Sequence, residues 1–418
     1  MRLQLQTDRT LIRAGARSTR YLVASLIAPN AARRDRRLPI NVALVLDRSG
    51  SMEGAKIQLA RQAVQRSLEA LDANDRFAVV VYDNIVSVVT PSTPATSQAK
   101  SQALQALELV AARGTTDLGS GWLRGCEQVA QFADGERVSR CLLLTDGLAN
   151  VGITDRDALA CHAEELRRRG VQTSTFGVGV DFDERLLRDM AQAGSGNFYF
   201  ISSAEQIPDL MTSELGEALE VVVRRAALEL SLPHGATAKP LQSFRHFYAG
   251  GDRELHIELG DLVSGQQMDV VVEIELDGGL EGADATVDVV ATSRASDGPT
   301  VRAHQRWLYA SHGANDEQPR DRVVDRQVAT LYAARARADA AEMNRAGLYE
   351  RACEVLRRTA KRIRSYAGTD PELNRIADEL DGELEKFSEP LPAPALKQTF
   401  FASHAAMAER SPMGRARR

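Results

Sequence analysis

Residues 42–46 read Val-Ala-Leu-Val-Leu, and residues 47–51, which follow at once, read Asp-Arg-Ser-Gly-Ser. A continuous apolar run of this kind is typical of a parallel strand that is buried on both faces. Open α/β sheets bind their ligands beyond the carboxyl ends of such strands. We therefore expect the side-chain oxygens of Asp47, Ser49 and Ser51 to hold a cation at the end of this strand.

Two further segments carry matching side chains. Residues 114–118 read Gly-Thr-Thr-Asp-Leu, and residues 142–147 read Leu-Leu-Leu-Thr-Asp-Gly, a second apolar strand that ends in Asp146. With the first loop, they resemble the metal-ion-dependent adhesion site (MIDAS) of the von Willebrand factor type A (vWA) domain. That pattern is Asp-x-Ser-x-Ser, a distant Thr and a distant Asp, and the resemblance covers about residues 39–220.

The resemblance implies a role for each site residue. Ser49 and Ser51 would bind the metal directly, and Thr116 would join them in the ligand-bound arrangement. Asp47 and Asp146 would act largely through water and orient the hydroxyls. Oxygen-only donors select hard cations and argue against zinc, so the expected metal is Mg²⁺, with Mn²⁺ or Ca²⁺ as alternatives.

A metal held mostly by neutral hydroxyls keeps an open position for an outside anion. In the vWA family that anion is typically an Asp or Glu carboxylate of a partner protein, so the resemblance implies a protein-recognition surface. One departure leaves open which threonine binds, because Thr115 stands where the family usually has glycine. The loop residues expected to form the partner-binding rim are Met52, Glu53, Asp117, Leu148 and Asn150.

The chain divides into segments of different hydrophobic period. Strands and helices alternate over residues 39–220, which predicts a doubly wound, mainly parallel, Rossmann-like sheet with helices on both faces. Within it, an edge strand at 86–90 is expected to stop at Pro91. Period-two runs over 221–312 predict an antiparallel β-sandwich, completed by strands from residues 1–38. The vWA domain is therefore expected to be inserted into the sandwich, with 33–37 as a charged linker.

The remaining residues predict a helical region and a tail. Residues 320–388 carry apolar stripes at helical spacing, and Asp370 followed by Pro371 is typical of a helix start. Residues 389–418 combine prolines with a basic end. They predict either a disordered tail or a partner-binding peptide built on Phe400 and Phe401.

Composition narrows the class of protein. The 418 residues have a net charge of −5, which argues against nucleic-acid binding. No apolar stretch reaches the roughly 20 residues of a membrane span. The cysteines, which show no paired or metal-binding spacing, are expected to be reduced core thiols of a cytoplasmic protein. They are Cys126, Cys141, Cys161 and Cys353.

The leading functional hypothesis is a non-enzymatic, Mg²⁺-dependent adaptor or regulatory scaffold. Resemblance suggests an AAA+ ATPase or a kinase or phosphatase module as its partner. An alternative is a structural protein whose metal site is filled by a carboxylate of its own helical region or tail. A metal-assisted phosphohydrolase fits less well, because Ser49 stands where such enzymes want a second acid and no lysine follows in a suitable loop.

Overall fold

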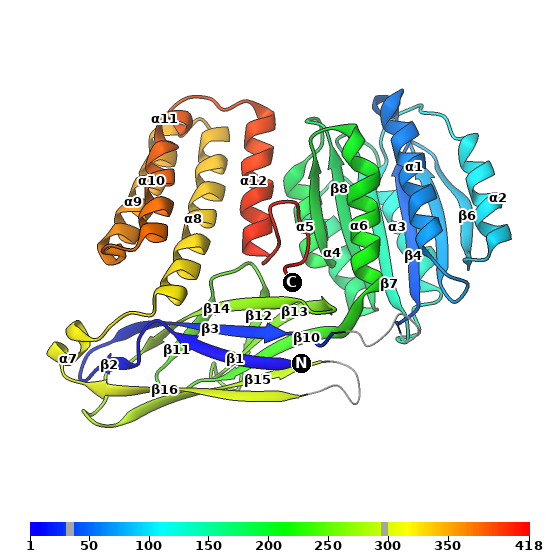
Figure 1. Cartoon of the computed structure of the whole chain (residues 1–418). Helices are drawn as coiled ribbons and strands as arrows, with labels where there is room; N and C mark the ends of the chain where they lie inside the picture. Colours follow the sequence, from blue (N-terminus) through cyan, green and yellow to red (C-terminus); the bar gives the residue numbers. More distant parts are fainter. Residues whose placement is uncertain (31–36, 294–299) are drawn as a thin grey trace. The chain divides into compact units, whose positions relative to one another are not determined.

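The computed structural model describes residues 1–30, 37–293 and 300–418, and the chain divides into two compact units (Figure 1). One unit is Ala32–Val221, and the other combines Met1–Ala31 with Val222–Arg418. The first unit therefore interrupts the sequence of the second. Of the charged linker predicted at 33–37, only Arg37 lies within the described residues.

The first unit is built on a six-stranded sheet with the order β6-β5-β4-β7-β8-β9. All neighbours are parallel except the edge pair of β5 and β6. The chain leaves β4 for β5 on one side and later returns to β7 on the other side, so β4 stands at the topological switch point. The strands are β4 (Ile40–Asp47), β5 (Arg76–Tyr82), β6 (Val86–Pro94), β7 (Val138–Thr145), β8 (Val171–Val178) and β9 (Ser195–Ile201).

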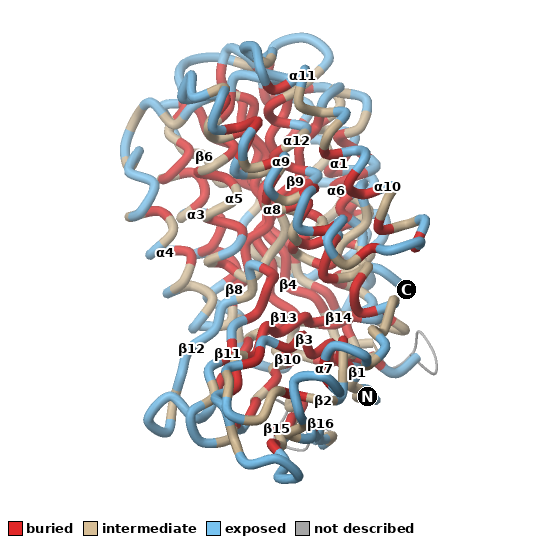
Figure 2. The backbone as a smooth tube through the Cα atoms, turned by 90° about the vertical axis from the view of Figure 1, so that its left-hand side faces the viewer, coloured by how far each residue is buried: buried red, intermediate tan, exposed pale blue. Residues whose placement is uncertain are grey.

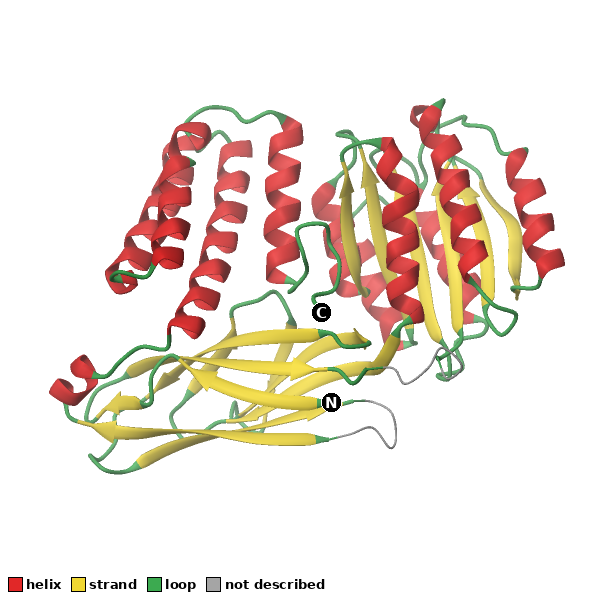
Figure 3. Ribbon diagram, in the orientation of Figure 1, coloured by secondary structure: helices red, strands yellow, loops and turns green. Residues whose placement is uncertain are grey.

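Helices cover both faces of this sheet (Figure 3), with α1 and α6 on one face and α3, α4 and α5 on the other. Every residue of β4 is buried, as expected for a central strand (Figure 2). The helices are η2 (Gly50–Met52), α1 (Ala55–Ala70), α2 (Ser97–Glu108), α3 (Leu118–Ala130), α4 (Arg156–Arg168), α5 (Glu184–Ala193), η3 (Ala204–Gln206) and α6 (Ile207–Leu219).

Glycines set how closely α3 approaches the sheet. A Cβ on Gly125 would lie 2.2 Å from Cγ2 of Val45, and one on Gly121 would lie 2.4 Å from Cγ of Tyr82. Both distances are too short for real atoms, so α3 packs against β4 and β5 only because these positions carry no side chain. This packing holds the N-terminus of α3, just after Thr116, near the end of β4.

The edge strand is longer than predicted. β6 continues through Pro91 to Pro94, so the expected stop at Pro91 is wrong. Its pairing with β5 has register shifts around Val79. Proline lacks a backbone N–H, and an edge strand with irregular pairing tolerates that loss.

The second unit contains a β-sandwich with sheet orders β1-β3-β14-β11 and β12-β13-β10-β15-β16-β2. The pairs β1/β3, β3/β14, β11/β14, β12/β13, β10/β15 and β15/β16 are antiparallel, and β16 pairs with β2 in parallel. Residues from both sheets, including Leu22, Leu228, Val270, Val287 and Trp307, share one core. The strands are β1 (Arg2–Thr7), β2 (Leu11–Arg13), β3 (Ser18–Ile27), β10 (Val221–Ser231), β11 (Thr237–Pro240), β12 (Arg245–Ala249), β13 (Glu254–Val263), β14 (Gln267–Leu276), β15 (Asp284–Thr292) and β16 (Val301–Ala310).

Helices follow the sandwich in the same unit. Val324 and Val328 of α8 pack against Tyr21, Val23 and Val271 of the sandwich. The helices are α7 (His312–Glu317), α8 (Arg322–Arg345), α9 (Tyr349–Ala367), α10 (Pro371–Gly382), α11 (Leu384–Phe387) and α12 (Ala393–Met407). The predicted fold class, a doubly wound, mainly parallel Rossmann-like sheet inserted into a β-sandwich and followed by helices, is confirmed.

The prediction for the tail is wrong. Ala393–Met407 forms α12, which packs along α8 (Figure 1). Phe400 and Phe401 are only 3% and 5% exposed. They are buried within the chain and do not form an exposed peptide, because α12 turns its apolar side toward the unit.

Two expectations about whole-chain properties can be compared with the structure. Of the cysteines, Cys126, Cys141 and Cys353 are buried and free, whereas Cys161 is free but exposed, so the expected core position is wrong for Cys161. Among the helices within 1–30, 37–293 and 300–418, none has both the length and the apolar character needed to cross a membrane.

Candidate metal centre

Asp47 is the last residue of β4 and its side chain is fully buried. Its Oδ1 accepts a hydrogen bond from the backbone N–H of Ser49 (2.7 Å), and its Oδ2 accepts one from the hydroxyl of Thr145 (2.7 Å). Burial raises the pKa of Asp47 to about 6, while the hydrogen bonds from Thr145 and Ser49 act in the opposite direction. The carboxylate is thus held in one orientation at the end of the strand.

Two serine hydroxyls and a second carboxylate form a continuous chain of contacts. The Oγ atoms of Ser49 and Ser51 are 3.0 Å apart. The Ser51 hydroxyl also donates to Oδ1 of Asp146 over 2.6 Å. Ser49 and Asp146 are almost completely buried, whereas Ser51 is exposed. The ends of β4 and β7 therefore bring these oxygens together.

The loop of residues 114–117 adds Thr116, which is 4% exposed. Its backbone N–H donates to Oδ1 of Asn150 (3.0 Å), and its carbonyl accepts from the N–H of Asn150 (3.2 Å). A Cβ placed on Gly147 would lie 3.4 Å from Oγ1 of Thr116 and 3.8 Å from Oγ of Ser51. Two hydroxyl oxygens thus border the same small space in front of Gly147.

Lys56 also contacts this group of oxygens, which the sequence analysis did not anticipate. Its Nζ donates to Oδ2 of Asp146 and to the carbonyl oxygen of Ser51 (3.2 Å). Lys56 is in the first turn of α1, shortly after the serine loop of residues 48–51. The closeness of Lys56 to Ser51 in the sequence is the signal that could have predicted its contact with the site.

Asp83 is a second residue that the sequence analysis missed. It follows β5, and its fully buried carboxylate accepts from Nε of Arg113 (2.8 Å) and pairs with Nε of Arg48 (3.2 Å). The backbone joins the same segments, because Arg113 N–H donates to the Arg48 carbonyl (2.7 Å) and Gly50 N–H to the Gly114 carbonyl (3.1 Å). Asp83 therefore ties the serine loop to the threonine loop.

The residues predicted to form the rim differ in exposure. Glu53, Leu148 and Asn150 are exposed. Met52 is fully buried inside the 3-10 turn η2, so its assignment to a partner-binding rim is wrong. Asp117 is partly buried, and its side chain caps α3 by accepting from the N–H of Ser120 (3.0 Å). The burial of Met52 depends on what packs against its side chain, which the residues around Ser51 do not reveal.

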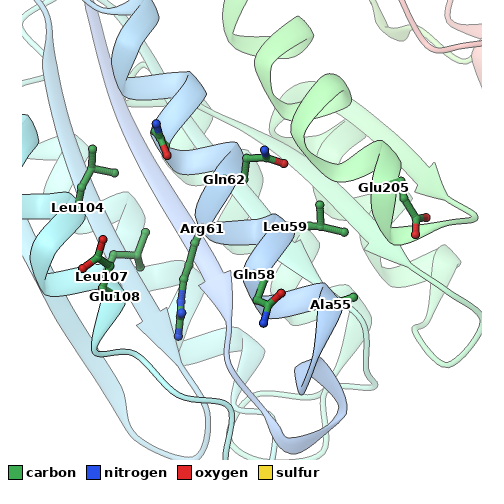
Figure 4. A pocket seen from close by; sticks show the side chains of 10 residues that line it. Ala55, Gln58, Leu59, Arg61, Gln62, Leu104, Leu107, Glu108 and Glu205 are labelled. Carbon is green, nitrogen blue, oxygen red and sulfur yellow. The ribbon is translucent and has the colours of Figure 1, made fainter.

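A groove of about 780 Å³ runs along the outer side of α1 (Figure 4). Its lining begins at Ala55, next to Lys56, and includes Gln58, Arg61, Leu107, Glu108 and Glu205. These side chains come from α1, the end of α2 and η3, as Figure 4 shows. The groove mixes amide, charged and apolar groups and contains none of the five predicted metal ligands.

The donor set fits a hard cation. Asp47, Ser49, Ser51, Thr116 and Asp146 offer only oxygen, and two of the hydroxyls border the space in front of Gly147. No cluster of three or more His, Cys, Asp or Glu side chains suited to a metal occurs in the described part of the chain. A metal here would therefore depend on the hydroxyls as well as on the carboxylates.

Comparison with known proteins finds similarity over the first unit. Residues 41–213 match the model of the von Willebrand factor type A domain. The uncharacterized protein YfbK of Escherichia coli is 25% identical over 59% of this chain and 44% of its own length. Inter-alpha-trypsin inhibitor heavy chain H4 of Homo sapiens is 29% identical over 38% of this chain and 18% of its own length. The chain thus spans less than half the length of both relatives.

A solved structure extends the similarity to both units. The von Willebrand factor type A protein from Catenulispora acidiphila superposes with a TM-score of 0.67. The match covers 91% of this chain and 96% of that one, at 18% sequence identity. At this identity the likeness concerns the fold alone.

Proposed function

Since residues 41–213 match the model of the von Willebrand factor type A domain, we propose that the chain is a Mg²⁺-dependent protein-recognition module. The partner would present an Asp or Glu carboxylate to the metal. The observation that carries this proposal is the contact chain from Ser49 Oγ through Ser51 Oγ to Asp146 Oδ1, at 3.0 and 2.6 Å. It joins oxygen atoms that follow two strands, β4 and β7, into one set of donors.

Five residues would hold the metal: Asp47, Ser49, Ser51, Thr116 and Asp146. When bound, Mg²⁺ would supply an electrophilic centre with an open position for an outside anion. The protein's own part is to orient the donors. Thr145 and the Ser49 N–H hold Asp47, and Asp83 holds the loops of Ser51 and Thr116 against each other.

The surroundings support binding of a protein. Ser51 is exposed at the surface, and Leu148 beside Asp146 is 56% exposed. An apolar side chain next to charged groups is common where a partner docks. We extend the proposal to an adaptor or scaffold role in the cytoplasm, with an AAA+ ATPase or a kinase or phosphatase module as partner.

A phosphohydrolase is the competing function. The sequence analysis found no lysine in a suitable loop, but Lys56 in the first turn of α1 does contact Asp146. A different observation weighs against it: Asp47 is fully buried, and both of its carboxylate oxygens already accept hydrogen bonds. A nucleophilic aspartate needs an accessible oxygen. The geometry favours an orienting role for Asp47.

The proposal is tested by calorimetric titration of MgCl₂ into the purified chain and into Ser51→Ala. We expect heat of binding from the wild type and a loss of at least about ten-fold in affinity for Ser51→Ala, since one donor is removed. Ser101→Ala, an exposed serine of α2, is the matched control and should bind like the wild type. No Mg²⁺ binding by the wild type would contradict the proposal.

Partner recognition is tested by capture on immobilised protein with Mg²⁺, with EDTA, and with Ser51→Ala. A protein retained only by the wild type with Mg²⁺ is the expected result. Retention that is unchanged by EDTA would exclude the metal site as the recognition surface. Loss of protease resistance in the helical region of Ser51→Ala would instead favour a site filled by an internal carboxylate.

A further inference from the structure

Lys56 pairs with a buried carboxylate of the candidate site, that of Asp146. Its Nζ contacts Oδ2 of Asp146, whose side chain is completely buried, while the lysine side chain is 30% exposed. The same ammonium group donates to the carbonyl oxygen of Ser51 at 3.2 Å. Lys56 is thus attached to both the serine loop and the second strand end.

The pairing uses one side of a carboxylate whose other side faces the metal donors. Oδ1 of Asp146 accepts from Ser51 Oγ, and Oδ2 accepts from Lys56. The carboxylate of Asp146 therefore contacts both the ammonium group and a hydroxyl that would bind a cation. At so short a range, in a partly buried place, like charges repel strongly.

The charges of the site leave room for one anion. The carboxylates of Asp47 and Asp146 alone would neutralise a divalent cation. Lys56 adds a further positive charge, and the neighbouring group of Arg48, Arg113 and Asp83 is also positive overall. A site that holds a divalent cation is consequently left with an excess of positive charge, and a carboxylate from outside reduces that excess.

We propose that Lys56 couples metal binding to anion binding. By repelling the cation it keeps the affinity for metal alone low, and it makes the affinity rise when a carboxylate is present. Because coupling between two ligands is reciprocal, the metal equally strengthens the binding of the carboxylate. The inference rests on the proposed function, since it assigns a regulatory role to a residue of the same site.

The test measures binding of Mn²⁺ to the full chain by the electron paramagnetic resonance signal of the free ion. Mn²⁺ is a hard cation that suits an oxygen site and reports binding directly. Lys56→Gln removes the charge, Lys56→Met is a second neutral variant, and Lys56→Arg keeps the charge as the matched control. Each protein is titrated in sodium chloride and in sodium acetate of equal ionic strength, and circular dichroism verifies the fold.

We expect both neutral variants to bind Mn²⁺ about five-fold or more tightly than the wild type in chloride, and Lys56→Arg to bind within about two-fold of it. Acetate should tighten Mn²⁺ binding by the wild type more than by the neutral variants. A metal-binding wild type whose neutral variants bind equally or more weakly would overturn the inference and leave the proposed function intact. Absence of Mn²⁺ binding by every protein, wild type included, would overturn both.

Discussion

At the scale of single residues, Asp83 illustrates how one buried carboxylate positions two loops. It pairs with Arg48 in the serine loop and with Arg113 in front of the threonine loop, at 3.2 and 2.8 Å. Its Oδ1 also accepts from the N–H of Ile85 (2.6 Å). Removal of its charge would leave Arg48, which is 9% exposed, without a counter-ion.

We predict that Asp83→Asn lowers the free energy of unfolding by about 2–4 kcal/mol, since it breaks a buried ion pair. Mg²⁺ affinity should fall as well, because the two loops are no longer held together. Urea unfolding and MgCl₂ titration measure the two effects. Asp209→Asn, which removes an exposed partner of Arg66, is the control and should cost at most about 1 kcal/mol. Equal effects of the two substitutions would argue against the role of Asp83.

At the scale of elements, the approach of α3 to the sheet depends on Gly125. We predict that Gly125→Ala lowers the free energy of unfolding by about 1–3 kcal/mol, because the new methyl group would meet Val45. Gly216→Ala in α6 is the matched control, since among the described residues nothing lies within 4 Å of its added Cβ. There alanine should stabilise the chain by up to about 1 kcal/mol. Thermal or urea unfolding measures whether Gly125→Ala lowers and Gly216→Ala raises the free energy of unfolding.

The segment after α12 carries an acid that should make stability depend on pH. Burial raises the pKa of Glu409 to about 7, against attraction by Arg417 and a hydrogen bond from Gln242, while Asp269 adds repulsion. Arg326 and Glu372 line the same cavity of about 210 Å³. In the unfolded chain a glutamate has its ordinary pKa of 4.5. Between about pH 4.5 and 7 Glu409 therefore binds more protons in the folded chain than in the unfolded chain, and its contribution to stability falls as pH rises.

We predict that Glu409→Gln removes this dependence. From pH 5 to pH 8 the wild type should lose about 2 kcal/mol relative to the variant, with most of the loss below pH 7. Urea unfolding at several pH values measures the difference. Glu385→Gln, at an exposed position of α11, should keep the pH dependence of the wild type. An identical slope in Glu409→Gln and the wild type would contradict the prediction.

At the scale of the whole molecule, each unit has its own core. The sandwich buries Leu228 and Trp307, and the α/β unit buries Val45 and Trp122. We predict that the chain unfolds in two calorimetric transitions, one for each unit. MgCl₂ at a hundred-fold excess over its Kd should raise the free energy of unfolding of the α/β unit alone, by about 2.7 kcal/mol. Leu228→Ala should lower the free energy of unfolding of the other unit by about 2–5 kcal/mol. A single transition that responds to both changes would show that the units unfold together.

Much of the fold could be predicted because its signals are local. The apolar run before Asp47 and the alternation over 39–220 belong to single strands and helices, so neighbouring residues are enough to recognise them. Asp370 and Pro371 likewise predicted the start of α10, where the Asp370 side chain accepts from the N–H groups of Glu372 and Leu373. Edge pairing, which let β6 pass Pro91, is not a local property.

The sequence by itself determined the doubly wound domain, its insertion into a sandwich, and the oxygen donors at the strand ends. Only the tertiary structure decided how those donors are held. Asp83 meets Arg48 and Arg113 across 35 and 30 residues, and Lys56 meets Asp146 across 90. Met52 and Phe400 became buried for the same reason, since burial depends on what packs against a side chain and not on its neighbours in the sequence.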